Sequence, residues 1–206
     1  MVVSAKSRFK SIDDIIKAKR IKAGFSGAGS DDYYGMILAG RALGFKVETV
    51  TGYKGANEAN LAGVKGEVEA VQSSYRTMRP LIESKDVIPV LVFGEKRLTE
   101  LPNVPTVFEV GSGDSKKVME ALLTVFQMER AMFAPPGVPA GKVKVLREAL
   151  GKAVADPDFK KDSEKNRRPV EFLTGGKVEE MIKQLKGVEG VLKPQVMDIA
   201  KTVGQG

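Results

Sequence analysis

Groups that could hold a small anion gather in three short loops of this sequence. The first loop, SGAGS at residues 26–30, consists of small residues that leave backbone N–H groups free to face a ligand. The second loop, TGYKGAN at residues 51–57, adds a phenol and an ammonium group, and the third, SSYR at residues 73–76, adds two hydroxyl groups. Together they favour a small anion, most simply a carboxylate. The candidate ligand-binding residues in these loops are Ser26, Gly27, Ala28, Gly29, Ser30, Tyr53, Lys54, Gly55, Ser73 and Ser74.

The sequence predicts a strand before each loop and a helix after it. The strands are expected at residues 20–25, 45–51 and 67–74, from their short apolar or alternating patterns. In an open α/β sheet, ligands bind at the carboxyl edge of the strands, close to the N-termini of helices. Each loop alone would equally suit an ordinary turn, but their shared position at one edge favours a binding site.

Local signals mark the helices of the same region. Ser11 and Ser30 are suitable N-caps, and Gly44 and Gly66 are suitable helix ends. An apolar strand is also expected at residues 86–94. Strand and helix then alternate from Lys10 to Gly94, which predicts an α/β fold with a mostly parallel sheet and helices on both faces. The expected helices cover residues 11–19, 30–44, 55–66 and 75–84.

The regular alternation ends after Phe93. Residues 95–117 are rich in turn residues, and one short helix is expected there with Pro105 as its first residue. Residues 118–130 fit either a helix or a mixture of strand and helix, because hydrophobic periodicity alone does not separate the two.

The last third of the sequence is predicted to be mainly helical. Strands are expected at residues 131–134 and 167–173, and a helix at residues 174–196 that Pro194 could break. Between the two strands lies an amphipathic helix with one apolar face turned inward. The residues of that face are Val143, Leu146, Ala149, Leu150 and Val154.

Composition excludes several kinds of chemistry. The 206 residues include no histidine and no cysteine, which removes Ser-His-Asp and Cys-His nucleophiles, Cys/His zinc sites and disulfides. Acids, lysines, serines and tyrosines remain, so catalysis of other kinds stays open. The net charge of +7 is spread along the chain and fits either anionic partners or a solvated basic surface.

Several motif matches fail on their details. The start of a dinucleotide fingerprint at Gly27 meets Asp32 where a glycine is needed, and residues 137–143 form a P-loop pattern that is one residue too short. Residues 7–10 fit S-x-x-K without its partner motifs. The pair Asp31–Asp32 reads as surface acids at a helix start rather than a metal site. The basic run at residues 160–168 has no interleaved aromatic residues, so nucleic acid is not an expected partner.

The sequence has no apolar run long enough to span a bilayer. Its opening residues, MVVSAKSRFK, carry charges where a signal peptide would be apolar. A mature exported protein would also begin without a signal peptide, so both a periplasmic and a cytoplasmic location stay open.

Several motifs in order resemble the extracytoplasmic solute receptors of the tripartite tricarboxylate transporters, the Bug or TctC-like proteins. The resemblance runs from about residue 9 to about residue 185. Its most specific pieces are Tyr-Lys-Gly at residues 53–55, LPNVPT at residues 101–106 and APPGVP at residues 134–139. Family members commonly carry His where this chain has Tyr33 and Ser where it has Phe25, so ligand selectivity is expected to differ.

The resemblance implies a type II periplasmic-binding-protein fold, in which two α/β lobes close on a small carboxylate without catalysis, metal or cofactor. The expected lobe is a three-layer α/β/α structure with an incomplete second lobe. The expected divisions are a ligand-binding lobe at residues 1–95, a connector at residues 96–131 and part of the other lobe at residues 132–206. Implied partners are a dicarboxylate, tricarboxylate or aromatic acid and the membrane subunits of a transporter in the periplasm. Tyr33 joins the candidate ligand-binding residues on this ground.

The family's amino-terminal segment, which begins the first lobe, has no counterpart in the sequence. The chain is therefore expected to represent about the last two thirds of a receptor. Three alternatives stay open: an interaction or structural protein that forms a packed or domain-swapped homodimer, a cytoplasmic small-molecule sensor like the effector domains of LysR-type regulators, and an α/β enzyme with a phosphorylated substrate.

Overall fold

The computed structural model describes residues 1–128, 130–166, 170 and 172–203 of the chain. By its internal contacts the chain divides into two compact units. Unit 1 comprises Met1–Phe126 together with Val188–Gly206, and unit 2 comprises Gln127–Gly187. The boundaries expected for receptor lobes at residues 95 and 131 stay predictions.

Unit 1 is built on a five-stranded sheet in the order β3-β2-β4-β1-β5. Strand β2 pairs in parallel with β3 and β4, whereas β1 pairs antiparallel with β4 and β5. Four strands therefore run in one direction and β1 alone runs against them, which confirms the predicted mostly parallel sheet. The strands are β1 (Val2–Ser4), β2 (Arg20–Gly24), β3 (Lys46–Val50), β4 (Ala70–Val71) and β5 (Val87–Pro89).

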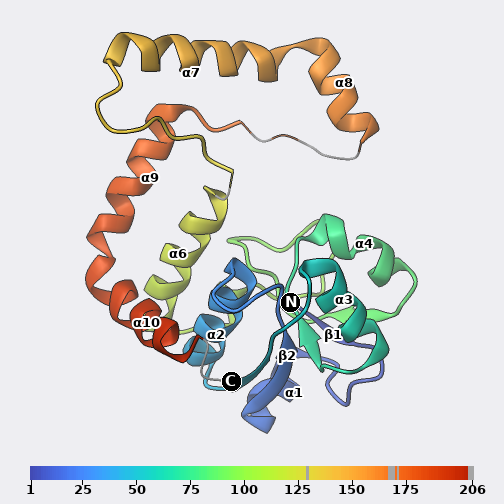
Figure 1. Ribbon diagram of the computed structural model, residues 1–206. Coiled ribbons are helices and arrows are strands. Elements are labelled where there is room, and N and C mark those ends of the chain that lie inside the picture. Colours follow the sequence, from blue (N-terminus) through green and yellow to red (C-terminus); the bar gives the residue numbers. More distant parts are fainter. Residues whose placement is uncertain (129, 167–169, 171, 204–206) are drawn as a thin grey trace. The chain divides into compact units, whose positions relative to one another are not determined.

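Helices cover both faces of this sheet. In β1 the neighbouring residues Val2 and Val3 enter two different apolar clusters, because successive strand residues point to opposite faces. Residues of α1, α2, α5, α6 and α10 belong to the cluster around Val3, and residues of α3 and α4 belong to the cluster around Val2. Figure 1 shows α2 and α6 on one side of the strands and α3 and α4 on the other. The result is the predicted three-layer α/β/α arrangement. The helices of this unit are α1 (Ile12–Ala18), α2 (Asp31–Leu43), α3 (Ala56–Lys65), α4 (Tyr75–Glu83), α5 (Val107–Val110), α6 (Asp114–Gln127) and α10 (Glu189–Thr202).

The expected helix caps are found at Ser11, Gly44 and Gly66, whereas Ser30 occupies the N-cap position of α2 without a side-chain hydrogen bond to the helix. The Ser11 hydroxyl accepts a hydrogen bond from the Asp14 N–H, and the Asp14 carboxylate accepts one from the Ser11 N–H. Helices α2 and α3 end at Gly44 and Gly66, whose φ angles of 81° and 82° are left-handed and suit glycine. These helix ends confirm the sequence prediction.

Two predicted helix boundaries around prolines are wrong. Helix α5 begins at Val107 with Thr106 as its N-cap, so Pro105 precedes the cap and is not the first helical residue. The helix predicted at residues 174–196 is divided at Val188, where α9 (Gly175–Gly187) ends and α10 begins. Pro194 lies inside α10 and does not end it. Thr106 and Glu109 form a capping box, which places the start of α5 after Thr106.

Unit 2 contains α7 (Ala140–Ala155), α8 (Pro157–Lys165) and α9 (Gly175–Gly187). Residues 131–134 form no strand, contrary to prediction, and the strand expected at residues 167–173 falls largely outside the described residues. The predicted inward face of α7 is not buried: Leu146 is 60% exposed, Ala149 and Leu150 are also exposed, and Val143 and Val154 are only partly buried. The described part of this unit offers no sheet for that face to pack on.

A membrane-crossing segment is not found among the described helices, since none of them is both long enough and apolar enough.

Candidate functional site

The three predicted loops begin side by side at one edge of the sheet. Gly24, the last residue of β2, is in register with Val50 at the end of β3 and with Val71 at the end of β4. Tyr53 of the second loop also lies against Gly24, since a Cβ placed on Gly24 would stand 3.2 Å from its ring. The fold therefore brings the three loops together as the sequence predicted.

Asp32 organises the first loop. One carboxylate oxygen accepts the Ser26 backbone N–H at 2.8 Å, and the other accepts the Ser26 hydroxyl at 2.9 Å and the Tyr33 N–H at 3.0 Å. The Ser30 hydroxyl also contacts this carboxylate and lies 2.7 Å from the carbonyl oxygen of Gly27. Asp32 is only 8% exposed, so it is a buried acceptor and not the surface acid that the sequence suggested.

The tip of the first loop keeps its amide donors. Within the part of the chain that the structure describes, the N–H groups of Gly27, Ala28 and Gly29 donate no hydrogen bond. Ala28 and Gly29 are exposed, and Gly29 has a φ of 85°, which turns the chain toward α2. This backbone can donate hydrogen bonds to a bound group.

The second loop combines a hydrogen bond that fixes its backbone with two functional side chains. The Glu58 carboxylate accepts the N–H of Lys54, the residue before the N-cap of α3. The N-cap itself is Gly55, which has a φ of 121° and gives α3 no side-chain cap. The ammonium group of Lys54 is on an exposed residue at this edge. Partial burial raises the pKa of the Tyr53 phenol, and the carboxylates of Glu67 and Glu58 raise it further, so this phenol stays protonated.

In the third loop the two serines have different surroundings. Ser74 is the N-cap of α4, and its hydroxyl accepts the Thr77 N–H at 3.3 Å and lies 2.9 Å from the Thr77 hydroxyl. Ser73 is partly buried beside it. Just before them, Gln72 packs its carboxamide against Gly35 of α2, and its buried Oε1 has no hydrogen-bond partner among the described residues.

Tyr33 and Phe25 lie in the core below the first loop. Tyr33 is 3% exposed, and its ring packs edge-on against Phe25 with centroids 5.2 Å apart. The Tyr33 side chain thus fixes α2 against the sheet, and a direct role in ligand contact stays a prediction.

Sequence reasoning did not identify three residues that shape this edge. The sequence patterns indicated Asp32 only as a surface acid that is incompatible with a dinucleotide, and they gave no role to Glu58 or Gln72. The signals available were Glu58 four residues after Lys54 at a helix start, and a carboxamide directly after a buried strand.

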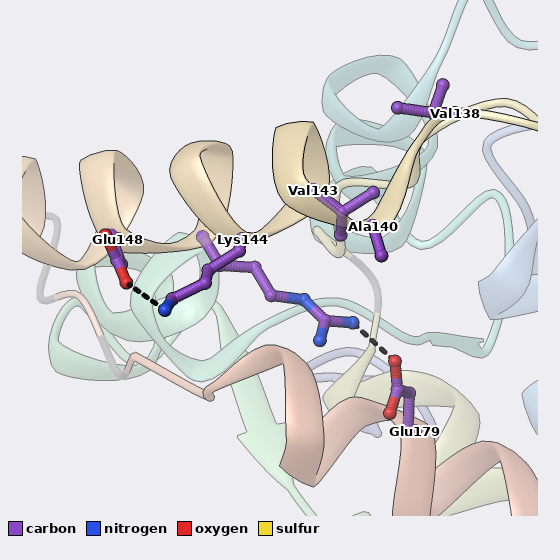
Figure 2. A pocket seen from close by; sticks show the side chains of 7 residues that line it. Val138, Ala140, Val143, Lys144, Glu148 and Glu179 are labelled. Atoms are coloured by element: carbon purple, nitrogen blue, oxygen red, sulfur yellow. Dashed lines mark hydrogen bonds and ion pairs between the residues drawn. The ribbon is translucent and has the colours of Figure 1, made fainter.

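The structure also contains a cleft in unit 2, which includes none of the predicted residues. It has a volume of about 450 Å³ and lies between α7 and α9. Figure 2 shows Lys144 and Glu148 on α7 and Glu179 on α9; Lys144 and Glu148 pair at 3.9 Å, and Glu179 accepts a hydrogen bond from Arg147. The cations and anions of this cleft therefore neutralise one another, which leaves no excess charge for an anion.

A metal centre has no support in the described residues, which hold no group of three or more acids. The donors at the loop edge are amides, hydroxyls and one ammonium group, which suit an anion rather than a cation.

Comparison with protein families matches most of the chain to a known family. Residues 1–185 match the model of the TctC family, described as the tripartite tricarboxylate transporter family receptor. This match covers all three loops of unit 1 and nearly all of unit 2.

Curated relatives are similar over most of this chain. A UPF0065 protein of Pseudomonas sp. strain P51, encoded between tcbD and tcbE, is 32% identical over 165 residues, which are 77% of this chain and 46% of that protein. A UPF0065 protein of Bordetella pertussis is 27% identical over 160 residues, which are 78% of this chain and 43% of that protein. The chain thus spans less than half the length of these relatives.

Solved structures share the fold. A TctC solute-binding protein from Polaromonas without ligand superposes with a TM-score of 0.62 at 16% identity, over 100% of this chain and 65% of that one. An R. palustris protein with adipate gives 0.64 at 20% identity, over 97% and 64% of the two chains. MatC from Rhodopseudomonas palustris with bound malate gives 0.59 at 16% identity, over 97% and 65%.

Proposed function

This chain belongs to the tripartite tricarboxylate transporter receptor family, and we propose that it binds a small organic carboxylate at the loop edge of unit 1. The family is one of receptors and not of enzymes. The chain spans under two thirds of the length of each solved structure described above. That it has the activity of a whole receptor is therefore part of the proposal. A dicarboxylate, tricarboxylate or aromatic acid is the expected ligand, in line with the adipate and malate held by two of the structural neighbours.

The observation that carries this proposal is the register of three strand ends. Gly24, Val50 and Val71 are aligned, so the amides of residues 27–29, the ammonium of Lys54 and the hydroxyl of Ser73 start from one edge. The ammonium of Lys54, together with the hydroxyl of Ser73, can bind a carboxylate, and the free amides of residues 27–29 can donate to another acceptor group of the same ligand. The loops carry polar groups and lie over apolar core residues such as Phe25 and Tyr33. This combination is the usual composition of a small-ligand site.

Calorimetric titration with a panel of dicarboxylates, tricarboxylates and aromatic acids tests the proposal. We expect at least one acid to bind, and Lys54→Ala to weaken its binding about tenfold, the usual effect of losing one charge-assisted hydrogen bond.

The matched control is Lys46→Ala, which removes the same charge from the exposed first residue of β3, at the end of the strand opposite to the loop that carries Lys54. Its affinity should stay within about twofold of the unmodified chain. Equal weakening by both variants, or no heat with any acid, would count against the loop edge as the binding site.

We further propose that a whole receptor of this kind works in the periplasm and delivers its ligand to the membrane subunits of a transporter. Family membership supports this, and one structural neighbour is a periplasmic binding protein, BugD. Uptake of labelled carboxylate into vesicles that contain the membrane subunits should require the receptor. Uptake that continues at the same rate without it would refute delivery.

The alternative of a homodimer has one observation in its favour. Large apolar side chains of unit 2 are exposed, among them Leu146 at 60% and Val145 at 63%. Light scattering tests it: a mass that doubles with concentration supports a dimer, and a monomer mass at high concentration rejects it.

A further inference from the structure

The carboxylate of Asp32 occupies the place at the start of α2 where an external anion would otherwise bind. Helix N-termini favour an anion because unsatisfied N–H groups and the helix dipole converge there. Here the backbone N–H groups of Ser26 and Tyr33 already point at Asp32, within 2.8 Å and 3.0 Å of its oxygens. The chain therefore supplies its own anion.

Both serine hydroxyls of the first loop are also directed inward. The Ser26 hydroxyl lies 2.9 Å from Asp32, and the Ser30 hydroxyl contacts only acceptors, the Asp32 carboxylate and the carbonyl oxygen of Gly27. A hydroxyl group has one proton, so each serine offers only lone pairs to anything outside the loop. The loop thus presents acceptors beside the free amides of residues 27–29.

We propose that Asp32 is a specificity-determining residue that makes the loop at residues 26–30 accept an uncharged hydrogen-bonding end of the ligand and reject a carboxylate. A hydroxyl or amide end can donate to the serine oxygens and accept from the loop amides at the same time. A carboxylate end has no proton to donate to the serine oxygens, and the buried charge of Asp32 repels it. The carboxylate of the ligand then belongs at the other loops, where Lys54 supplies a cation.

This inference rests on the proposed function and narrows its ligand class to acids with one carboxylate at one end and a hydroxyl or amide at the other. A receptor that binds a carboxylate at each end of its ligand would differ from this chain.

Asp32 acts through the loop that it holds in place and through its charge, so it is tested as a positioning residue. The readout is a change in ligand preference.

The test compares adipate with its analogue in which one carboxylate is replaced by a hydroxymethyl group. Titrations are followed through the backbone amide resonances of the three loops, because this reports weak binding at millimolar concentration. In the unmodified chain we expect the hydroxymethyl analogue to bind about tenfold more tightly than adipate.

Asp32→Asn removes the charge with little change of shape, and we expect it to tighten adipate binding about tenfold while the analogue changes by less than about threefold. Asp32→Ser is a second neutral variant, whose hydroxyl can still accept a hydrogen bond, and it guards against a local loss of folding specific to asparagine. Asp31→Asn is the matched control, since it makes the same charge change on the neighbouring exposed residue, and it should leave the preference unchanged.

The outcomes separate the inference from the proposed function. In one outcome the loop resonances shift with both acids, and the two affinities are equal in the unmodified chain and in both Asp32 variants. This result would support the proposed function and would overturn the role of Asp32. A preference that Asp31→Asn removes as fully as Asp32→Asn would also overturn it. No shift with either acid in any variant contradicts both.

Discussion

At the scale of single residues, the loop edge is defined by which hydrogen-bonding groups are already paired within the chain. Asp32 takes the hydroxyl of Ser26 and the N–H groups of Ser26 and Tyr33, and Glu58 takes the N–H of Lys54. The sequence placed Ser26 and Lys54 among the candidate ligand-binding residues. The paired groups hold the loops in place, and the donors left for a ligand include the amides of residues 27–29, the ammonium of Lys54 and the hydroxyl of Ser73.

Gln72 gives a stability prediction at this scale. Its buried Oε1 has no partner among the described residues, and an unpaired buried acceptor costs free energy. Gln72→Met keeps the length of the side chain and removes the oxygen, so the free energy of unfolding should stay constant or rise by up to about 1 kcal/mol. Urea denaturation measures it.

Gln72→Glu is the contrasting variant, because it places a charge at the same buried position. It should lower the free energy of unfolding by about 2 kcal/mol or more. If Gln72→Met is less stable than Gln72→Glu, the prediction is wrong, and the carboxamide of Gln72 makes a hydrogen bond that the described residues do not show.

At the scale of elements, α2 approaches the sheet so closely that one of its glycines cannot be replaced freely. A Cβ on Gly40 would stand 2.8 Å from the Phe45 carbonyl oxygen and 2.8 Å from Cγ2 of Val47. Gly40→Ala should therefore lower the free energy of unfolding by about 1–3 kcal/mol, although alanine favours the helix. Thermal and urea denaturation measure this change.

The control for that variant is Gly190→Ala in α10, where an added Cβ meets nothing within 4 Å. This change should raise the free energy of unfolding by about 0.5–1 kcal/mol. Similar effects of the two substitutions would show that helix propensity, and not close packing, decides the cost at Gly40.

The start of α5 predicts a dependence of stability on pH. Hydrogen bonds from Arg97, and then from the Thr106 N–H, lower the pKa of Glu109 to about 2. Because the folded pKa lies below the ordinary value of 4.5, the ionised carboxylate stabilises the fold above pH 4.5, and this contribution is lost as the pH falls toward 2. Glu109→Gln should therefore be less stable than the unmodified chain at neutral pH.

The difference in the free energy of unfolding between the Glu109→Gln variant and the unmodified chain should become smaller as the pH falls below the ordinary pKa of a glutamate. Urea midpoints at neutral pH and at about pH 3 measure it. A difference that is the same at both pH values would contradict the assigned role of Glu109.

Most elements of the first half of the chain could be predicted because they carry their own local signals, whereas the short strand β1 (Val2–Ser4) was not predicted. Ser11 begins α1, and Gly44 and Gly66 end α2 and α3, so caps and periodicity agreed there. The second half lacks such agreement. Apolar spacing in α7 predicts a buried face, but spacing does not show whether a partner surface exists, and Leu146 is exposed.

The candidate site was predictable in position but not in its internal bonding. The strand-loop-helix pattern located residues 26–30, 53–55 and 73–74 at one edge, since parallel strands end together. The burial of Asp32 and Tyr33 depends on how α2 packs on the sheet, which sequence patterns do not encode.

At the scale of the whole molecule, the two units differ in their cores. Both apolar clusters belong to unit 1, whereas Met181 is the one fully buried apolar side chain among the described residues of unit 2. Helices with few buried contacts open more easily. We expect the backbone amides of α9 to exchange hydrogen at least about tenfold faster than those of α10, which buries Ile199 in unit 1.

The comparison of α9 with α10 is matched because the two helices have similar lengths and follow one another in the sequence. Equal exchange protection of the two helices would show that the units unfold as one.

The central claim is that the three loops of unit 1 form the carboxylate-binding surface. A crystal structure with the acid that binds most tightly tests it most directly. We expect the ligand against the amides of residues 27–29, with its carboxylate near Lys54 and Ser73. A ligand held instead in the cleft of unit 2, beside Lys144 and Arg147, would contradict the claim.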